Sequence, residues 1–271
     1  MRIPLPRIVY PLICLTWAAV MLYFYQSGRL VRYLAPDFRN FCLIGGLGLG
    51  VIGLFVLLTS SEEVDCGHDH SEGDPHDHES NEMHPLTSAV LMLAPLLFAL
   101  FSTKDGFSAL ALSRKALYDA PSSKNVFLAS ALPPLTIEEI EKTHRKSTTG
   151  EYEFNLMELY FAIGDPELLK LIDGMKVVTE GRMVAERDNN ANGTRKRLYR
   201  LFITCCAADA RAVPIIAEFG KTPPNVEENS WMKLTGVIRF PMENGARQAV
   251  LEVETSEKSD PPWEESFMRQ Q

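Results

Sequence analysis

Five of the six histidines in this chain of 271 residues lie in one short stretch, between Cys66 and His84. Histidine imidazoles and carboxylates are common ligands of zinc and other divalent transition metals. The surrounding segment, residues 61–85, is rich in Asp and Glu and contains no Lys or Arg. We therefore predict a low-affinity metal-binding loop. Its predicted ligands are Cys66, His68, Asp69, His70, His76, Asp77, His78 and His84.

This His-rich loop lacks the composition of a folded element. Val64 and Met83 are its only sizeable apolar side chains, and Gly and Pro interrupt it. Such a segment is expected to be disordered, so it should bind several ions loosely rather than one ion tightly. The alternative is a solvated acidic linker in which the histidines are incidental, but their dense clustering favours metal binding.

A second group of reactive side chains, Cys205, Cys206 and Asp209, follows a predicted strand. An outward-facing thiol beside Asp209 would make a soft-metal or redox site. Successive residues of a strand face opposite sides, so one cysteine should face the core and the other should not. The alternative is a buried packing cysteine with Asp209 capping the turn through the local backbone, and residue chemistry alone favours this alternative.

Three apolar segments in the first half, residues 8–27, 41–60 and 86–102, approach the roughly 20 residues that a bilayer-spanning helix needs. No small-residue cleavage site follows the first segment, so we expect a retained helix rather than a signal peptide. The third segment is short, and Pro95 should kink it. We predict a transmembrane domain over residues 1–103 with three spans.

Small residues on the second span form a predicted packing surface. Gly46, Gly50 and Gly53 are spaced i, i+4, i+7 and so share one face of a helix. Such a face lets another transmembrane helix approach closely. The predicted partner is the first span, the third span or another protein, and the alternative is that these glycines are merely scattered along an apolar helix.

The distribution of Lys and Arg predicts the membrane orientation. The turn at residues 28–40 and the residues after 103 carry more basic side chains than the N-terminus. Basic residues favour the cytoplasmic side. We therefore expect an external His-rich loop and a cytoplasmic C-terminal half.

The second half of the chain has a mixed, soluble composition. We expect a tether with a short helix over residues 104–150, an α+β domain over 151–255 and a disordered tail over 256–271. Thr136 and Glu139 have the spacing of a helix capping box. Five short strand patterns with glycine bends and no crossover helices predict a five-stranded OB-like β-barrel. The patterns cover residues 174–186, 195–206, 211–219, 231–240 and 246–255.

Charge and motif content limit the function classes. The net charge of −8 argues against a nucleic-acid partner, which needs a basic footprint. The basic cluster Arg195, Lys196, Arg197 and Arg200 keeps single-strand binding open as a minor alternative. The sequence has no phosphate-binding glycine loop, no HExxH motif and no nucleophile elbow, so we do not expect an enzyme.

The arrangement of these features resembles the DUF1980 family of bacterial membrane proteins. The resemblance is carried by the His-rich loop between apolar spans, by the Cys-x-Ala-Asp stretch at Cys206–Asp209, and by Trp231 and Gly236 on a later strand. It implies an accessory membrane subunit of a two-component permease, acting beside a larger multi-spanning permease in the bacterial cytoplasmic membrane. It also implies a link to divalent metals such as zinc.

Two functions therefore remain as expectations. In the first, the chain is a permease subunit whose glycine face packs against the partner and whose His-rich loop concentrates metal near the pore. In the second, it is a stand-alone membrane protein that buffers or senses metal and signals through a cytoplasmic interaction domain. The second function requires no permease partner.

Overall fold

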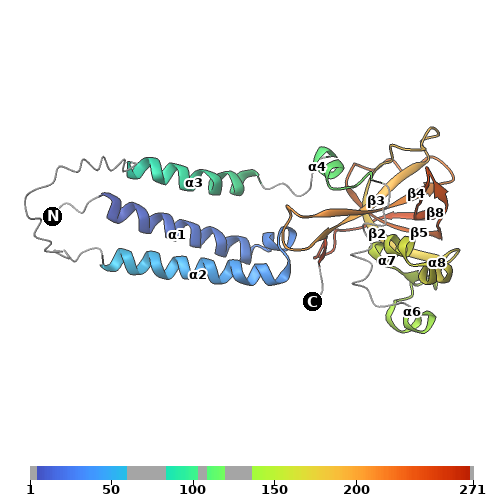
Figure 1. Cartoon of the computed structure of the whole chain (residues 1–271), viewed down its shortest axis with the longest axis horizontal. Helices are drawn as coiled ribbons and strands as arrows, with labels where there is room; N and C mark the ends of the chain where they lie inside the picture. Colours follow the sequence, from blue (N-terminus) through green and yellow to red (C-terminus); the bar gives the residue numbers. More distant parts are fainter. Residues whose placement is uncertain (1–4, 60–83, 103–108, 120–135, 269–271) are drawn as a thin grey trace, which may run out of the picture. The chain divides into compact units, whose positions relative to one another are not determined.

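The computed structural model describes residues 5–59, 84–102, 109–119 and 136–268. The chain divides into two compact units, residues 1–105 and 106–271. The boundary is close to the predicted end of the transmembrane domain. Figure 1 shows the elements of both units.

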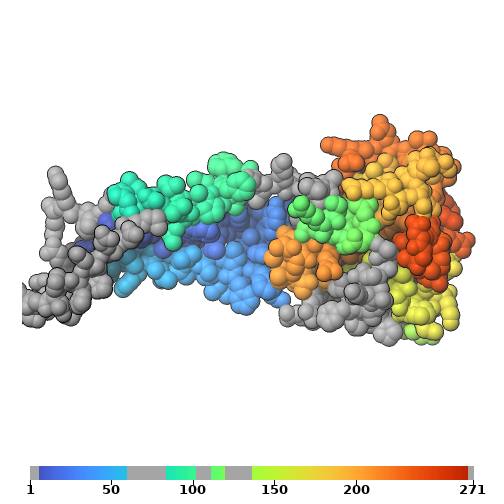
Figure 2. Space-filling model, turned by 45° about the horizontal axis from the view of Figure 1, so that its top comes forward, coloured from blue at the N-terminus to red at the C-terminus, as the bar shows by residue number. Residues whose placement is uncertain are grey.

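The first unit is built from apolar helices. They are α1 (Leu5–Gln26), the short 3₁₀ helix η1 (Arg29–Arg32), α2 (Pro36–Thr59) and α3 (Pro85–Ser102). Both α2 and α3 pack against α1, and Figure 2 shows α3 lying along the other two helices. Two described stretches, Pro6–Gln26 and Pro36–Thr59, are long and apolar enough to cross a membrane. The apolar stretch of α3, Pro85–Phe101, is shorter.

The connection between α1 and α2 is shorter than the predicted turn at residues 28–40. Helix α2 begins at Pro36, because proline suits the first helical position, where its missing N–H has no intrahelical partner to lose. Arg39 therefore lies inside α2 rather than in the turn. Its guanidinium donates from Nε to the Leu34 carbonyl at 2.8 Å and from Nη2 to the Val31 carbonyl at 3.3 Å, so it ties the turn to the helix.

The glycine face of α2 packs against α1. A Cβ atom at Gly53 would lie 3.1 Å from the Leu15 Cγ and 3.1 Å from the Pro11 carbonyl oxygen. A Cβ at Gly46 would lie 3.1 Å from the Met21 Cβ. A Cβ at Gly50 would meet Ala18 at an ordinary 3.6 Å. Of the three partners that the sequence left open, the structure therefore selects the first helix.

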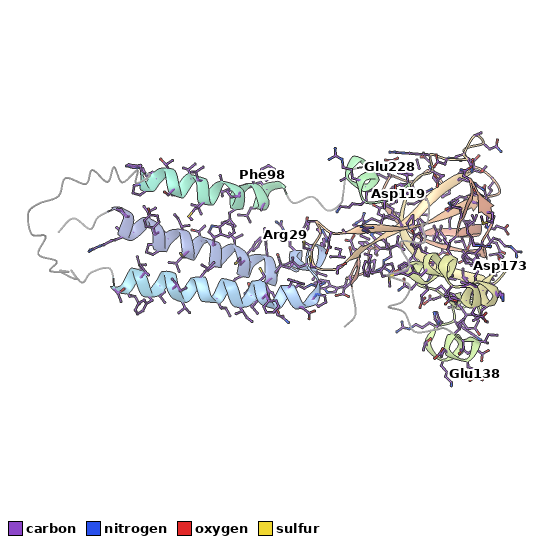
Figure 3. All side chains as sticks on the ribbon, viewed as in Figure 1. Arg29, Phe98, Asp119, Glu138, Asp173 and Glu228 are labelled. Atoms are coloured by element: carbon purple, nitrogen blue, oxygen red, sulfur yellow. The ribbon has the colours of Figure 1, made fainter. Side chains whose placement is uncertain are left out.

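The remaining surface of the helical unit is apolar and exposed. Figure 3 shows Phe98 on the side of α3 that faces away from α1 and α2, where 72% of the residue is exposed. Contiguous apolar surface of this kind is rare on proteins surrounded only by water. The large exposed side chains of α2 and α3 include Phe41, Ile44, Val51, Phe55, Leu58, Val90, Phe98 and Phe101.

The second unit combines short helices with a sheet. Its helices are α4 (Ala109–Arg114), α6 (Ile137–Thr143), α7 (Leu156–Phe161), η3 (Ala162–Gly164) and α8 (Pro166–Ile172). Its strands are β1 (Tyr152–Glu153), β2 (Lys176–Ala185), β3 (Arg195–Ile203), β4 (Arg211–Phe219), β5 (Ser230–Arg239), β6 (Met242–Glu243), β7 (Ala246–Arg247), β8 (Val250–Lys258) and β9 (Phe267–Met268). The predicted capping box of Thr136 and Glu139 starts α6.

The five long strands pair in a ring. β2 pairs with β5 through residues 176–183 and with β3 through residues 182–185. β3 continues to β4, β4 pairs in parallel with β8, and β8 pairs with β5. The sequence predicts a bend at Gly181, and this glycine lies where β2 begins to pair with β3. A Cβ there would lie 2.8 Å from the Tyr199 carbonyl oxygen, so a larger residue would obstruct the pairing.

Helix α7 fills one side of the ring. Asn155 caps it, and Glu158 bonds back to the Asn155 N–H, which gives a complete capping box. Its apolar side chains join the same core as the inward-facing residues of β2, β3, β4 and β5. The buried core residues of α7 are Leu156, Leu159, Tyr160 and Phe161.

Residues 109–119 are not a free tether. Leu112 and Leu117 are 0% and 1% exposed, and both pack with Val184, Tyr199 and Ala212 of the sheet. Figure 2 shows this segment in green, lying directly against the strands. Leu112 and Leu117 are buried by residues that lie far away in the sequence, so the composition of the segment itself does not predict their burial.

The predicted disordered tail is ordered through Met268. Strand β8 continues to Lys258, and β9 pairs in parallel with β3. Phe267 is buried, and the Arg200 guanidinium lies 4.1 Å from the centre of its ring. A single aromatic anchor in a polar stretch is enough to hold this segment to the sheet.

Close helix packing at Gly53 generates the first prediction. Replacing Gly53 with Val should lower the unfolding free energy of the helical unit by about 1–3 kcal/mol, because the new side chain overlaps Leu15 and Pro11. The matched control is Gly48→Val, since nothing lies within 4 Å of a Cβ at Gly48. Thermal unfolding of the full chain in detergent micelles measures both. Equal losses in the two variants would contradict the α1–α2 packing.

Candidate functional site

Most of the predicted metal loop lies outside the described residues. This applies to Cys66, His68, Asp69, His70, His76, Asp77 and His78. His84 is described and lies at the start of α3. Its Nδ1 accepts the Leu86 N–H at 3.3 Å, and its carbonyl accepts the N–H groups of Thr87 and Ser88. The imidazole thus helps to cap α3 through its Nδ1.

The Cys-x-Ala-Asp stretch forms a tight turn after β3. Asp209 accepts the Thr204 N–H at 3.2 Å and the Cys205 N–H at 2.8 Å, and it donates its own N–H to the Cys206 carbonyl at 3.0 Å. β3 ends at Ile203, so strand alternation does not apply to the cysteines. Both thiols are half-buried, which corrects the expectation of one inward and one outward side chain.

The turn sets the acidity of its own side chains. Hydrogen bonding to Asp209, then to Cys206, together with partial desolvation, raises the pKa of the Cys205 thiol to about 11. Partial burial acts to raise the pKa of Asp209, but hydrogen bonds from the Cys205 thiol and from nearby backbone N–H groups outweigh it, so the net pKa is lowered. A protonated thiol is a poor nucleophile and a poor metal ligand at neutral pH.

A lysine that the sequence placed in the tether holds this turn from outside. The Lys115 Nζ donates to the carbonyl oxygens of Ala207, Ala208 and Ala210 at 2.8, 3.4 and 3.3 Å. The Lys115 carbonyl in turn accepts the Ala212 N–H at 2.8 Å. Sequence reasoning missed this residue, because nothing local distinguishes it from a solvated surface lysine.

The contacts of the two cysteines and Asp209 favour packing and capping roles over the alternative of a metal site. The Cys205 thiol contacts the Cys206 sulfur at 3.7 Å, and both Asp209 oxygens accept backbone N–H groups. In the described part of the chain, no three His, Cys, Asp or Glu side chains are placed to hold a metal ion together. The geometry favours the capping role for Asp209.

The three arginines of the basic cluster on β3 have hydrogen-bond partners of their own. The Arg195 guanidinium donates to both oxygens of Glu243, at 2.8 and 2.9 Å. The Arg197 Nε donates to Glu186 at 2.6 Å, and both side chains of this pair are buried. Arg200 donates to the backbone carbonyls of residues 264 and 265. These three arginines are therefore not a free surface for phosphates.

These observations define a two-part protein. One unit consists of apolar helices, and the other is built on a ring of five strands and carries a Cys-Ala-Ala-Asp turn. The chain belongs to the DUF1980 family. The model of the DUF1980 N-terminal domain matches residues 10–115, and that of the DUF1980 C-terminal domain matches residues 169–265. The resemblance seen in the sequence is thereby confirmed.

Other comparisons add little. No curated protein matches the chain. The crystal structure of a DUF3299 family protein from Pseudomonas aeruginosa PAO1 is 9% identical and has a TM-score of 0.28. The match covers 41% of this chain and 97% of that one. At this level of similarity, nothing is inferred from it.

The raised pKa of Cys205 predicts slow alkylation. At pH 7.5 its thiolate fraction should be roughly a few hundredfold below that of an ordinary cysteine with a pKa near 8.5. Labelling with iodoacetamide over a range of pH, read residue by residue by mass spectrometry, should give a midpoint near 11 for Cys205. The chain unfolded in denaturant is the control. A midpoint equal to that of the unfolded chain would contradict the raised pKa, and a midpoint below it would favour a reactive site.

The contacts of Lys115 predict a stability effect. Lys115→Met should lower the unfolding free energy of the full chain by about 1–3 kcal/mol, because three turn carbonyls lose a charged donor. Lys170→Met on α8 is the matched control, because this amine is largely exposed and has only a long contact with Glu167. Denaturant unfolding measures both variants. An unchanged midpoint for Lys115→Met would show that the lysine does not hold the turn.

Proposed function

We propose that this protein is an accessory membrane subunit of a two-component permease in the bacterial cytoplasmic membrane, involved in handling a divalent metal such as zinc. The observation that carries the proposal is the broad apolar surface of α2 and α3, which is exposed in the isolated chain. Lipid covers part of such a surface, and a larger permease covers the rest.

The position of the glycine face revises the docking surface. Gly46 and Gly53 are already covered by α1, so they are not available to a partner. The partner instead contacts the outward faces of α2 and α3. This surface carries large side chains such as Phe55 and Phe98, which suit van der Waals packing between helices.

We treat α3 as a third span. Its 18 residues give a helix of about 27 Å, close to the roughly 30 Å hydrocarbon core. It packs against α1, and the Arg29 guanidinium reaches the Leu100 carbonyl at 3.5 Å. Pro95 lies inside the helix, where proline removes one backbone hydrogen bond, as is tolerated in membrane-spanning helices.

Three spans place the His-rich loop opposite the α1–α2 turn. The loop connects α2 to α3, whereas the turn contains Arg29, Arg32 and the nearby Arg39. The excess of basic residues assigns the turn to the cytoplasm. The loop is then external, where it captures metal before transport, and the C-terminal unit is cytoplasmic.

The ring of strands supports the proposal of an OB-like barrel. The first, second and third long strands pair consecutively, the third pairs in parallel with the fifth, and the fourth returns to the first. Helix α7 contributes to the interior. Such barrels bind ligands or partner chains through their strand faces and loops.

A stand-alone metal-buffering or sensing protein is the second candidate. The attachment of residues 109–119 to the sheet favours it, because this segment follows directly on the helical unit. The loop would buffer the metal, and the strand unit would contact a cytoplasmic partner. The two candidates differ in whether a permease is required.

Purification from native membranes separates the two functions. The full chain, tagged at its C-terminus and solubilised gently, should carry with it a multi-spanning protein in near-equal amount. Mass spectrometry identifies the partner and its stoichiometry. A chain that is repeatedly purified alone would contradict the subunit proposal and support the stand-alone role.

The metal part of the proposal is tested on the same preparation. Replacing His68, His70, His76, His78 and His84 with Ser should remove most of the zinc bound at equilibrium, measured by elemental analysis. His144→Ser is the control, because this histidine bonds to Glu158 in the second unit. Equal zinc content in both variants would exclude the loop from metal handling.

A further inference from the structure

A polar cavity lies at one end of the strand ring. It is formed between the β2–β3 loop, residues 186–194, and the segment that joins β5 to β8, residues 240–249. Its volume is about 160 Å³, and a wider groove of about 500 Å³ beside it shares Asn189 and Glu243. The residues that line the cavity include Tyr118, Asp119, Asp188, Asn189, Asn244 and Gln248.

The two loops are fixed to each other before any ligand binds. Arg195 bonds to both carboxylate oxygens of Glu243, and the Asn189 amide donates to the same carboxylate at 3.3 Å. The Asn190 amide donates to the carbonyls of Glu186 and Arg195 at 3.1 Å each. Fixed walls reduce the entropy lost on binding, so the cavity is preorganised.

The floor of the cavity is closed and neutral. Glu186 is paired with Arg197 at 2.6 Å, and it also accepts the N–H groups of residues 187 and 188. Arg197 donates to the Leu117 carbonyl at 2.5 Å, which brings the next residue, Tyr118, to the cavity. The Arg187 guanidinium lies 4.0 Å from the centre of the Tyr118 ring and covers it.

Four polar side chains are left to face a ligand. Within the described residues, no hydrogen bond or ion pair engages the side chains of Asp119, Asp188, Asn244 and Gln248. Figure 3 labels Asp119, which lies beside the strands close to α4. Carboxylates accept hydrogen bonds and amides both donate and accept them, so this set matches neighbouring hydroxyl groups.

The charge of the cavity disfavours an anionic ligand. Asp119 and Asp188 bring two carboxylates, whereas Arg195 and Arg197 already have acidic partners. A phosphate backbone would meet these two carboxylates, and the nearby Arg187 guanidinium, which stacks on Tyr118, offsets only one of them. A neutral, hydroxyl-rich ligand meets no such penalty.

We propose that this cavity binds a neutral saccharide through its hydroxyl groups. Asp119, Asp188, Asn244 and Gln248 supply the hydrogen bonds, and the fixed loops supply the shape. Loops at the corresponding position of OB-like barrels bind oligosaccharides, which supports this ligand class. The proposal depends on the cavity and its lining, and it stands whether or not the chain is a permease subunit.

The test uses the full chain in lipid nanodiscs, because sugar-headed detergents would compete for the cavity. Maltotriose, cellotriose and chitotriose are titrated by calorimetry, and contacts are read by saturation-transfer NMR. At least one trisaccharide should bind. Asp119→Ala and Gln248→Ala should each weaken it by about tenfold, the effect of one lost hydrogen bond to a charged or well-placed group.

The control is Glu257→Ala, because this exposed residue of β8 is absent from the cavity lining. Unfolding curves identify any variant that fails to fold, and Asp188→Ala then replaces it. Absence of binding by all three trisaccharides, or equal binding by cavity and control variants, would overturn the proposal. Preferential binding of a deoxythymidine oligonucleotide with a steep salt dependence would also overturn it.

Discussion

The second unit depends on the ability of β2 to pair with two strands at once. Its first part follows β5 and its last part also follows β3, so the strand must bend where the pairing changes. Gly181 lies at that point, and the Tyr199 carbonyl occupies the space that a Cβ would need. The bulge at Gly236 acts similarly between β5 and β8, since a Cβ there would overlap the Glu252 backbone. Without these two glycines the ring would be strained open.

Closing the ring determines what can come together at its ends. β3 begins at Arg195, beside the polar cavity, and ends at Ile203, just before the Cys-Ala-Ala-Asp turn. Residues 109–119 contact both places, because Lys115 holds the turn and Tyr118 reaches the cavity. One short segment is thus bonded to the family motif and to the proposed ligand site. A ligand that moves Tyr118 would therefore also move other residues of the segment 109–119.

Much of this architecture could be predicted from local pattern, and the rest could not. The alternation of apolar and polar residues, together with the glycine bends, predicted the five long strands. The predicted bounds of β4, residues 211–219, agree with those in the structure. The pattern 195–206 was too long, because Asp209 folds the backbone at residues 204–206 into a turn. The ordered roles of Leu112, Leu117 and Phe267 were missed, because each side chain is buried by residues distant in sequence. The metal-ligand prediction for the His-rich loop rests on residue chemistry alone.

The helical unit shows why small residues do not identify a partner. The spacing of Gly46, Gly50 and Gly53 predicts close helix approach, but it is equally compatible with contacts inside the chain and with contacts to another protein. The structure assigns the face to α1, because atoms of the Met21 and Leu15 side chains lie 3.1 Å from the positions that Cβ atoms at Gly46 and Gly53 would take. The apolar surface that stays exposed is therefore made of bulky side chains on α2 and α3. Association through such a surface depends on shape matching over a large area, so single substitutions there should matter less than the loss of one internal glycine.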